Sequence, residues 1–150
     1  MLALIQKVSK ASVEIESKVV SSIGEGYCIF LGIKETDDTQ DIDYIIKKIL
    51  RAKLFPDNKG RFKVNITDKK GQLLIVPQYT LYGDIKLKNS PSFTKAMRPL
   101  EASVLFNMFC NRIEDSIENP KFGKFGEFMK VKVINEGPVT FIISSDHLKK

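Results

Sequence analysis

The sequence predicts one mixed α/β domain over residues 1–150, in which a largely antiparallel sheet or barrel-like core carries two main helices. Short runs rich in Val, Ile and Leu recur between polar turns and indicate many strands. Two longer segments place apolar residues at the spacing of one helical face. A length of 150 residues, of which 43% are hydrophobic and 28% charged, suits a single globular domain with a sizeable core.

The amino-terminal third is predicted to form strands. Three runs typical of β-strands follow one another at residues 2–9, 11–16 and 18–23. The polar connections between them are so short that we expect the three strands to form a meander. Residues 27–33 are apolar throughout, a pattern typical of a strand covered on both faces. We therefore expect this last strand near the centre of the sheet.

The first predicted helix begins near Thr36 or Asp37, either of which can cap it, and its last turn contains Arg51. Acidic residues at its start and basic residues at its end complement the helix dipole. Its apolar residues share one face, and they are Ile42, Ile45, Ile46, Ile49 and Leu50.

The middle of the chain alternates turns and strands. Residues 57–60 and 69–71 are predicted turns, and residues 62–65 and 72–76 are predicted strands. Pro77 ends the hydrogen-bonding pattern of the second strand, so the residues that follow begin at an irregular point.

A long loop and a second helix follow. Residues 85–98 lack periodicity, and a loop of this length is often functional. Pro99 suits a first helical turn, and the helix is predicted to run to about Glu118. Residues 122–126 alternate aromatic residues with glycines and are predicted to be a loop. The apolar face of the helix consists of Ala102, Leu105, Phe106, Phe109, Ile113 and Ile117.

Residues 135–140 form a predicted tight turn between two strand-like runs, residues 130–133 and 139–143. Gly137 tolerates positive φ, and Pro138 fixes its own φ, so one interpretation is a hairpin corner. The other interpretation is a rigid Gly-Pro corner that directs backbone carbonyl groups toward a ligand.

Histidine and cysteine usage limits the chemistry that the chain can support. His147 is the only histidine, and Cys28 and Cys110 lack the spacing of a zinc or redox site. A histidine-based triad and a zinc-water hydrolase are therefore disfavoured, and we expect no metal and no cofactor. We interpret both cysteines as reduced, packed thiols.

Charge is distributed unevenly along the chain, whose formal net charge is +6. The stretch from Lys47 to Lys70 contains nine bases and two acids, and the stretch from Lys86 to Arg98 contains four bases and no acid. In contrast, the stretch from Glu35 to Asp43 contains five acids and no base. The two basic stretches are either a solvated surface or contacts to the phosphates of a polyanion. The sequence contains no signal peptide or membrane span, so we expect a cytoplasmic protein.

Two segments together resemble the D-aminoacyl-tRNA deacylase family. That family pairs a Ser-Gln-Phe-Thr-Leu segment with an Asn-x-Gly-Pro-Val-Thr segment near the carboxyl terminus. Residues 135–140 meet the second pattern in full, and Gln78, Thr80 and Leu81 meet the first. Further matches follow in order along the chain: Gln6-Lys7-Val8, Ala11-Ser12-Val13, Ile23-Gly24, Leu31-Gly32, Lys48-Ile49-Leu50, Pro91-Ser92-Phe93, and Phe125-Gly126 with Met129.

The resemblance implies a homodimeric hydrolase that proofreads translation by cleaving the ester of D-aminoacyl-tRNA. It implies activity on glycyl-tRNA mischarged on tRNA-Ala, sites shared between subunits, and a tRNA partner rather than DNA or a membrane. Carried over from the family, Gly137 and Pro138 enter the partner's pocket and reject L-amino acids. Thr80 and Gln78 take the catalytic positions. Candidates for the substrate and adenosine pocket are Pro77, Tyr79, Phe93, Phe125, Met129 and Asn135.

Thr80 invites interpretation as a covalent nucleophile, but no histidine can activate it and the nearest acid, Asp84, lies four residues on. An ester to ribose is already activated, so placing a water and polarising the carbonyl group could suffice for hydrolysis. The resemblance implies the same, because the family works largely through main-chain groups and the 2′-hydroxyl of the RNA.

Two departures from the family pattern keep alternatives open. Pro77 and Tyr79 stand where the family usually has Ser and Phe, and a related deacylase that removes L-alanine from the wrong tRNA shows Pro-Gln-x-Thr-Leu. Val139, however, matches the D-specific family. A different class of function is a non-catalytic module that binds RNA ends, with Phe125 or Phe93 as a stacking platform.

Overall fold

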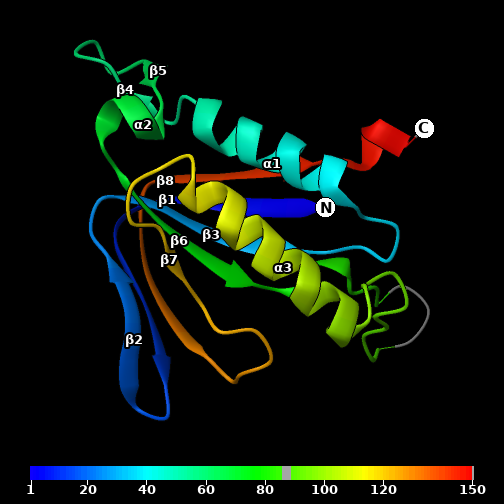
Figure 1. Cartoon of the computed structure of the whole chain (residues 1–150). Helices are drawn as coiled ribbons and strands as arrows, with labels where there is room; N and C mark the ends of the chain where they lie inside the picture. Colours follow the sequence, from blue (N-terminus) through cyan, green and yellow to red (C-terminus); the bar gives the residue numbers. More distant parts are fainter. Residues whose placement is uncertain (86–88, 150) are drawn as a thin grey trace.

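β1 (Leu2–Ile15) is the strand around which the sheet is built. It pairs antiparallel with β8 (Lys130–Ser144) along one edge, and with β3 (Gly26–Gly32) and then β2 (Lys18–Ile23) along the other. The computed structural model describes residues 1–85 and 89–149. Figure 1 shows two long helices lying across these strands.

The predicted strands 2–9 and 11–16 are one continuous strand, so the expectation of a three-stranded meander is wrong. Ser9 and Lys10 are exposed residues within β1. The register of β8 against β1 shifts between Val8 and Lys10. The polar pair therefore marks an irregularity in strand pairing. The chain reverses only at Glu16 and Ser17, both of which have positive φ.

The sheet continues beyond β3 with two parallel pairings. β6 (Gln72–Pro77) runs parallel to β3, and β7 (Lys121–Phe122) runs parallel to β6. The other pairings of the six-stranded sheet are antiparallel, which confirms the predicted mixed fold with a largely antiparallel sheet. The Ser21 hydroxyl donates to the carbonyl oxygen of Phe122 at 2.6 Å. This bond ties β2 to the opposite end of the sheet, which curls into a nearly closed barrel.

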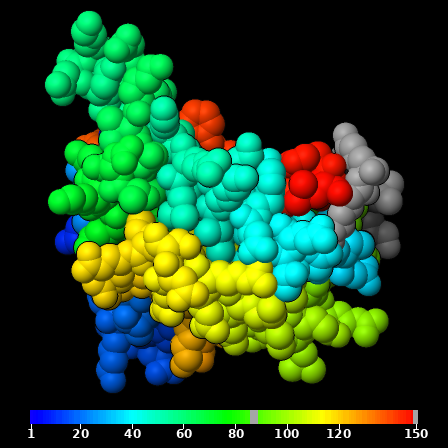
Figure 2. Space-filling view, turned by 45° about the horizontal axis from the view of Figure 1, so that its top comes forward, coloured from blue at the N-terminus to red at the C-terminus, as the bar shows by residue number. Residues whose placement is uncertain are grey.

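Two helices, α1 (Thr39–Arg51) and α3 (Pro99–Glu114), lie side by side over one face of the sheet (Figures 1 and 2). Along the central strands β3 and β6, alternating residues face either these helices or the barrel interior. On β3, Tyr27 and Ile29 belong to the cluster under the helices, and Cys28 belongs to the inner cluster. The fully buried residues of the inner cluster are Val8, Ala11, Val13, Ile23, Cys28, Leu74 and Val76.

The amino-terminal end of α1 is capped by Asp38 rather than by the predicted Thr36 or Asp37. The Asp38 carboxylate accepts the N–H of Gln40 at 2.8 Å, and the Asp41 carboxylate accepts the N–H of Asp38 at 2.8 Å. These reciprocal bonds satisfy donors that a helix start leaves free.

Asp37 instead binds the α-ammonium group of Met1 at 2.6 Å. The ammonium also donates to the Ser145 hydroxyl at 2.7 Å, and that hydroxyl donates to Asp41 at 2.5 Å. All four residues are buried, and desolvation raises the pKa of Asp37 although the ammonium opposes that shift. The buried ammonium cluster, formed by Met1, Asp37, Asp41 and Ser145, thus joins the starts of β1 and α1 to the residue after β8.

A small two-stranded sheet follows α1. It pairs β4 (Phe55–Pro56) with β5 (Phe62–Val64), which confirms most of the predicted strand 62–65. The predicted turn at residues 57–60 joins the two strands. A short helix, α2 (Ile66–Lys69), precedes the predicted turn at residues 69–71, and Lys70 has a left-handed φ of 55°.

Two predicted boundaries near the carboxyl end are wrong. α3 starts at Pro99 as predicted but ends at Glu114 rather than near Glu118, and residues 115–119 form turns, with a φ of 50° at Asn119. Residues 121–122 form β7, although the predicted loop 122–126 includes Phe122. Part of the predicted loop 85–98, residues 86–88, lies outside the described residues.

The hairpin predicted at residues 135–140 is also wrong. The runs on both sides of it belong to β8, and both pair antiparallel with β1. Glu136 to Val139 therefore form a bulge within one strand rather than a reversal of the chain. A short 3₁₀ turn (Asp146–Lys149) follows β8. Within the described residues, no helix has the length and apolar character needed to cross a membrane.

We expect Asp37→Ala to lower the free energy of unfolding by about 3 kcal/mol, because it leaves a buried ammonium with one counter-charge fewer. Asp43→Ala is the matched control. Asp43 also lies in α1, but its side chain is 67% exposed and pairs with Arg112 at the surface. Loss of that pair costs about 0–1 kcal/mol. Urea unfolding at neutral pH compares the two variants, and equal losses would contradict a structural role for the buried ammonium cluster.

Candidate ligand-binding pocket

A pocket of about 620 Å³ opens where the parallel strands β3 and β6 end. The carboxyl ends of neighbouring parallel strands leave a crevice in which ligands commonly bind. Buried Leu31 and Val76 form its floor. Its walls come from residues 93–99, from Ala102 of α3 and from residues 125–131. The volume suits a drug-sized ligand or the end of a larger one.

Pro77 and Gln78 lead the chain from β6 into the pocket. The N–H of Gln78 donates to the carbonyl oxygen of Leu31 at 2.8 Å, which extends the pairing of β3 with β6 past the end of β6. A 3₁₀ turn (Tyr79–Tyr82) follows and packs closely on β3. A Cβ built on Gly32 would lie 3.0 Å from the Cβ of Leu81, so this packing depends on glycine.

Aromatic side chains wall the pocket. The ring of Tyr79 meets that of Phe93 edge to face, with centroids 4.9 Å apart. Phe125 packs against Phe106 of α3, with centroids 5.9 Å apart. Phe128 also lines the pocket and is 85% exposed. Walls of this kind suit a flat ring, such as an aromatic side chain or a nucleic-acid base.

Thr80 lies beside the pocket, and the side-chain amide of Gln78 donates a hydrogen bond to its hydroxyl oxygen. An amide cannot accept a proton, so this bond does not activate the hydroxyl as a nucleophile. The N–H groups of Tyr79 and Thr80, at the start of the 3₁₀ turn, find no acceptor in the described part of the chain. Such donors are free to bind the oxygen of a ligand.

Arg98 and Glu127 place opposite charges at the pocket. Both are exposed, and Glu127 also pairs with Lys124 at 3.3 Å. The sequence pattern singled out neither as a site residue. Arg98 carries a signal that could have found it, because it ends the long basic loop and directly precedes the first residue of α3.

The bulge of β8 holds Gly137 and Pro138 away from this pocket, since neither lines it. The side-chain amide of Asn135 closes the bulge by donating to the Thr140 hydroxyl at 2.8 Å and accepting the N–H of Val139 at 3.2 Å. Gly137 has a φ of 129°, and a Cβ built on it would meet Val139 Cγ2 at 2.6 Å. Only glycine fits there. The Gly137–Pro138 peptide bond is cis.

The ten site residues predicted from the sequence therefore fall into two groups. Six line one pocket, and they are Pro77, Gln78, Tyr79, Phe93, Phe125 and Met129. Thr80 is joined to that group through Gln78. Asn135, Gly137 and Pro138 form the separate bulge.

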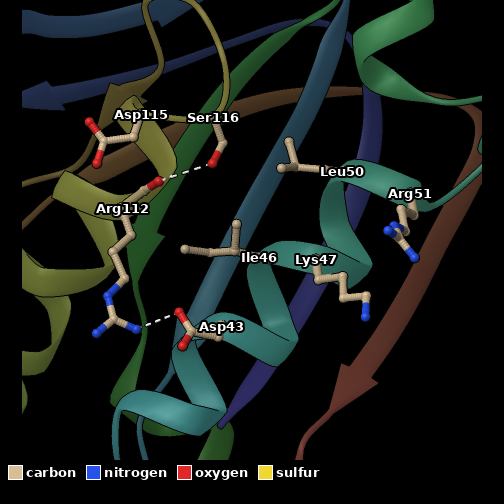
Figure 3. Close-up of a pocket in the computed structure, with 8 residues that line it drawn as sticks. All are labelled: Asp43, Ile46, Lys47, Leu50, Arg51, Arg112, Asp115 and Ser116. Carbon is tan, nitrogen blue, oxygen red and sulfur yellow. Dashed lines mark hydrogen bonds and ion pairs between the residues drawn. The ribbon is translucent and has the colours of Figure 1, made fainter.

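A second cavity, of about 460 Å³, lies between α1 and α3 (Figure 3). Arg112 of α3 pairs there with Asp43 of α1 and also donates to the carbonyl oxygen of Thr39 at 3.1 Å. Figure 3 shows Lys47 and Arg51 extending from α1 away from α3. Of the two guanidinium groups that line the cavity, that of Arg112 is already paired, and we assign the cavity no ligand.

Metal-binding and thiol chemistry find no support in the described residues. They contain no group of three or more His, Cys, Asp or Glu side chains that could hold a metal ion. Cys28 is buried and Cys110 is half-buried, and desolvation raises the pKa of each thiol to about 12. Neither thiol is poised to act as a thiolate nucleophile.

Comparison with known proteins gives consistent matches. The family model described as D-Tyr-tRNA(Tyr) deacylase matches residues 4–144. Proteins named D-aminoacyl-tRNA deacylase from Thermodesulfovibrio yellowstonii and a Nitratiruptor species are 43% and 44% identical to this chain. The first alignment covers 97% of this chain and 99% of that protein, and the second covers 99% and 100%.

Two solved structures share the fold. One, titled "c-Myc DNA Unwinding Element Binding Protein", is 35% identical, has a TM-score of 0.90, and covers 97% of this chain and 99% of its own. The other, titled as a probable eukaryotic D-amino acid tRNA deacylase, has a TM-score of 0.82. It covers 95% of this chain and 97% of its own, and at 16% identity it shows the fold alone.

Proposed function

The chain belongs to the D-Tyr-tRNA(Tyr) deacylase family, and we propose that its pocket receives the aminoacylated 3′ end of tRNA. It is a hydrolase of D-aminoacyl-tRNA, an activity for which its relatives are named. The reaction releases a D-amino acid and tRNA, and we extend it to glycyl-tRNA mischarged on tRNA-Ala. Such a proofreading enzyme would act in the cytoplasm, where charged tRNA is used.

The pocket between β3 and β6 is the observation that carries this proposal. Its aromatic walls suit the terminal adenine and the amino-acid side chain. The free N–H groups of Tyr79 and Thr80 suit the oxygen of an ester carbonyl group, on which negative charge develops during attack by water. An ester needs no metal to be hydrolysed if water is placed and the carbonyl group is polarised.

Selection against L-amino acids is assigned to Gly137 and Pro138, and it requires a second copy of the chain. Neither residue lines the pocket of its own chain. The bulge is exposed, and beside it β8 exposes Ile134, Phe141 and Ile142, which are 58%, 46% and 64% accessible. An apolar strand edge of this kind suits burial in a symmetric homodimer. Each bulge would then enter the partner's pocket and obstruct an L side chain.

Incubation with D-Tyr-tRNA and L-Tyr-tRNA tests the function. We expect release of free tyrosine only from the D form, since the obstruction depends on chirality. Binding of both charged tRNAs without release of either amino acid would instead identify a module that binds RNA ends. Release of L-alanine from mischarged tRNA in preference to D-tyrosine would place the chain with the related L-alanine deacylases.

We expect Thr80→Ala to retain deacylation within about tenfold of wild type, because only an amide reaches its hydroxyl oxygen. Thr67→Ala, in exposed α2, controls for the loss of a threonine remote from the pocket. Single-turnover deacylation of D-Tyr-tRNA measures both variants. A loss of about 10⁴-fold with unchanged tRNA binding would make Thr80 catalytic.

Mixing two inactive variants tests whether sites are shared. Ala96→Trp fills the pocket, and Gly137→Ala distorts the bulge, since the new Cβ would meet Val139 Cγ2 at 2.6 Å. If each site combines one pocket with the partner's bulge, every mixed dimer regains one intact site. Randomly mixed subunits should then recover about a quarter of wild-type activity.

Circular dichroism of each variant alone confirms that both remain folded. Complete inactivity of the mixture, in the presence of mixed dimers detected by native mass spectrometry, would show that each site lies within a single chain. The bulge would then be a local irregularity of β8.

A further inference from the structure

A narrow ribbon projects from the body of the molecule beyond the carboxyl end of α1. We define the basic ribbon as residues 53–64, which comprise β4, β5 and the turn between them. Figures 1 and 2 show it standing clear of the rest of the chain. Its base is anchored by Phe55, which is buried and stacks on Tyr27 with ring centroids 5.1 Å apart.

Asp57 fixes the turn of the basic ribbon. Its carboxylate accepts the backbone N–H groups of Lys59 and Arg61, each at 2.9 Å. It also binds the Arg61 guanidinium group through two bonds of 3.0 and 2.8 Å. The backbone N–H and the guanidinium of Arg61 lower the pKa of Asp57, so this carboxylate is ionised at neutral pH. One anion therefore shapes the turn and neutralises one of the ribbon's four cations.

The remaining cations, Lys53, Lys59 and Lys63, are exposed. None of them has an anionic partner among residues 1–85 and 89–149. Lys69, just outside the ribbon, differs because it pairs with Glu25 at 3.0 Å. The basic ribbon thus presents three positive charges without an anionic partner in the described part of the chain. They lie on a short hairpin whose turn is stabilised by Asp57.

The basic ribbon and the pocket lie at opposite ends of β6. The ribbon leads through α2 to the start of β6 at Gln72, and the pocket lies at its end, at Pro77. A strand rises about 3.3 Å per residue, so these ends are about 17 Å apart. A single nucleotide in the pocket cannot span this distance, whereas a tRNA stem can.

We propose that the basic ribbon binds the sugar–phosphate backbone of the tRNA whose 3′ end occupies the pocket, an inference that rests on the proposed function. Lysines bind phosphates as mobile point charges and give affinity without reading sequence. A two-stranded ribbon is narrow enough to approach a nucleic-acid groove, and the minor groove of RNA helices is wide and shallow. A flat membrane surface would be contacted only by the ribbon's tip.

The test compares Lys59→Ala/Lys63→Ala with a charge-matched control, Lys10→Ala/Lys18→Ala, which removes two exposed lysines of β1 and β2. Fluorescence anisotropy measures the Kd for uncharged tRNA-Tyr over a range of salt concentrations. We expect the Kd of the ribbon variant to rise on the order of tenfold at low salt. The slope of log Kd against log salt should fall by about 0.9 per lost contact, hence by about 1.8 for two contacts.

Two substrates separate this inference from the proposed function. D-tyrosyl-adenosine fills the pocket but cannot reach the basic ribbon, so the ribbon variant should hydrolyse it at the wild-type rate. The same variant should show a KM for D-Tyr-tRNA raised on the order of tenfold, with an unchanged kcat. If the wild-type protein hydrolyses neither substrate, the proposed function fails, and the anisotropy data still decide whether the ribbon binds RNA.

An unchanged Kd and salt slope in the ribbon variant would overturn the proposal, as would equal weakening in the control variant. Equal loss on D-tyrosyl-adenosine and D-Tyr-tRNA would show that the ribbon acts only through the fold. Loss of binding to phosphatidylserine vesicles, with tRNA binding intact, would assign the ribbon to a lipid surface instead.

Discussion

β1 forms backbone hydrogen bonds along both of its edges, and the positions of the pocket and the bulge are both set through it. Near its start, Ala3 pairs with Leu31, whose side chain lies in the pocket floor. Farther along, Gln6 and Val8 flank the bulge of β8. The distance between the pocket floor and the bulge is therefore fixed by the rise of one strand. The ammonium group of Met1 anchors that strand to α1 and to the end of β8.

In the proposed mechanism the chain positions the ester and the attacking water, and it contributes no reactive side chain. The pocket offers flat apolar walls, and beside it the N–H groups of Tyr79 and Thr80 find no acceptor in the described part of the chain. Neither Thr80 nor a cysteine thiol is activated, because an amide reaches the hydroxyl and burial raises the pKa of both thiols. Such a site can hydrolyse only a bond that is already reactive, which fits the ester of aminoacyl-tRNA. A site without an activated nucleophile would also leave the less reactive peptide and amide bonds of other molecules intact.

Sequence periodicity predicted the elements whose stability is local, and it failed where a distant partner decides the structure. α1 and α3 and the buried strands β3 and β6 follow from apolar spacing. β1 and β8 are continuous because each pairs with the other across more than a hundred residues, and no local pattern reports that pairing. The six predicted residues that line the pocket came from motif resemblance. Arg98 and Glu127 lie in neither motif segment, and only the position of Arg98 at the end of a basic loop, next to α3, could have indicated it.

The floor and the walls of the pocket differ in what the fold requires of them. Leu31 and Val76 belong to central strands and are almost fully buried, so replacing either one also disturbs the core. Phe93 and Phe128 lie outside helices and strands, where replacement costs the fold far less. Under the proposed function, substitutions at the walls can therefore change the accepted substrate at little cost in stability, whereas substitutions in the floor also destabilise the fold. Proteins of this fold that differ in substrate preference would then differ in sequence mainly in the loops, and much less in the strands of the sheet.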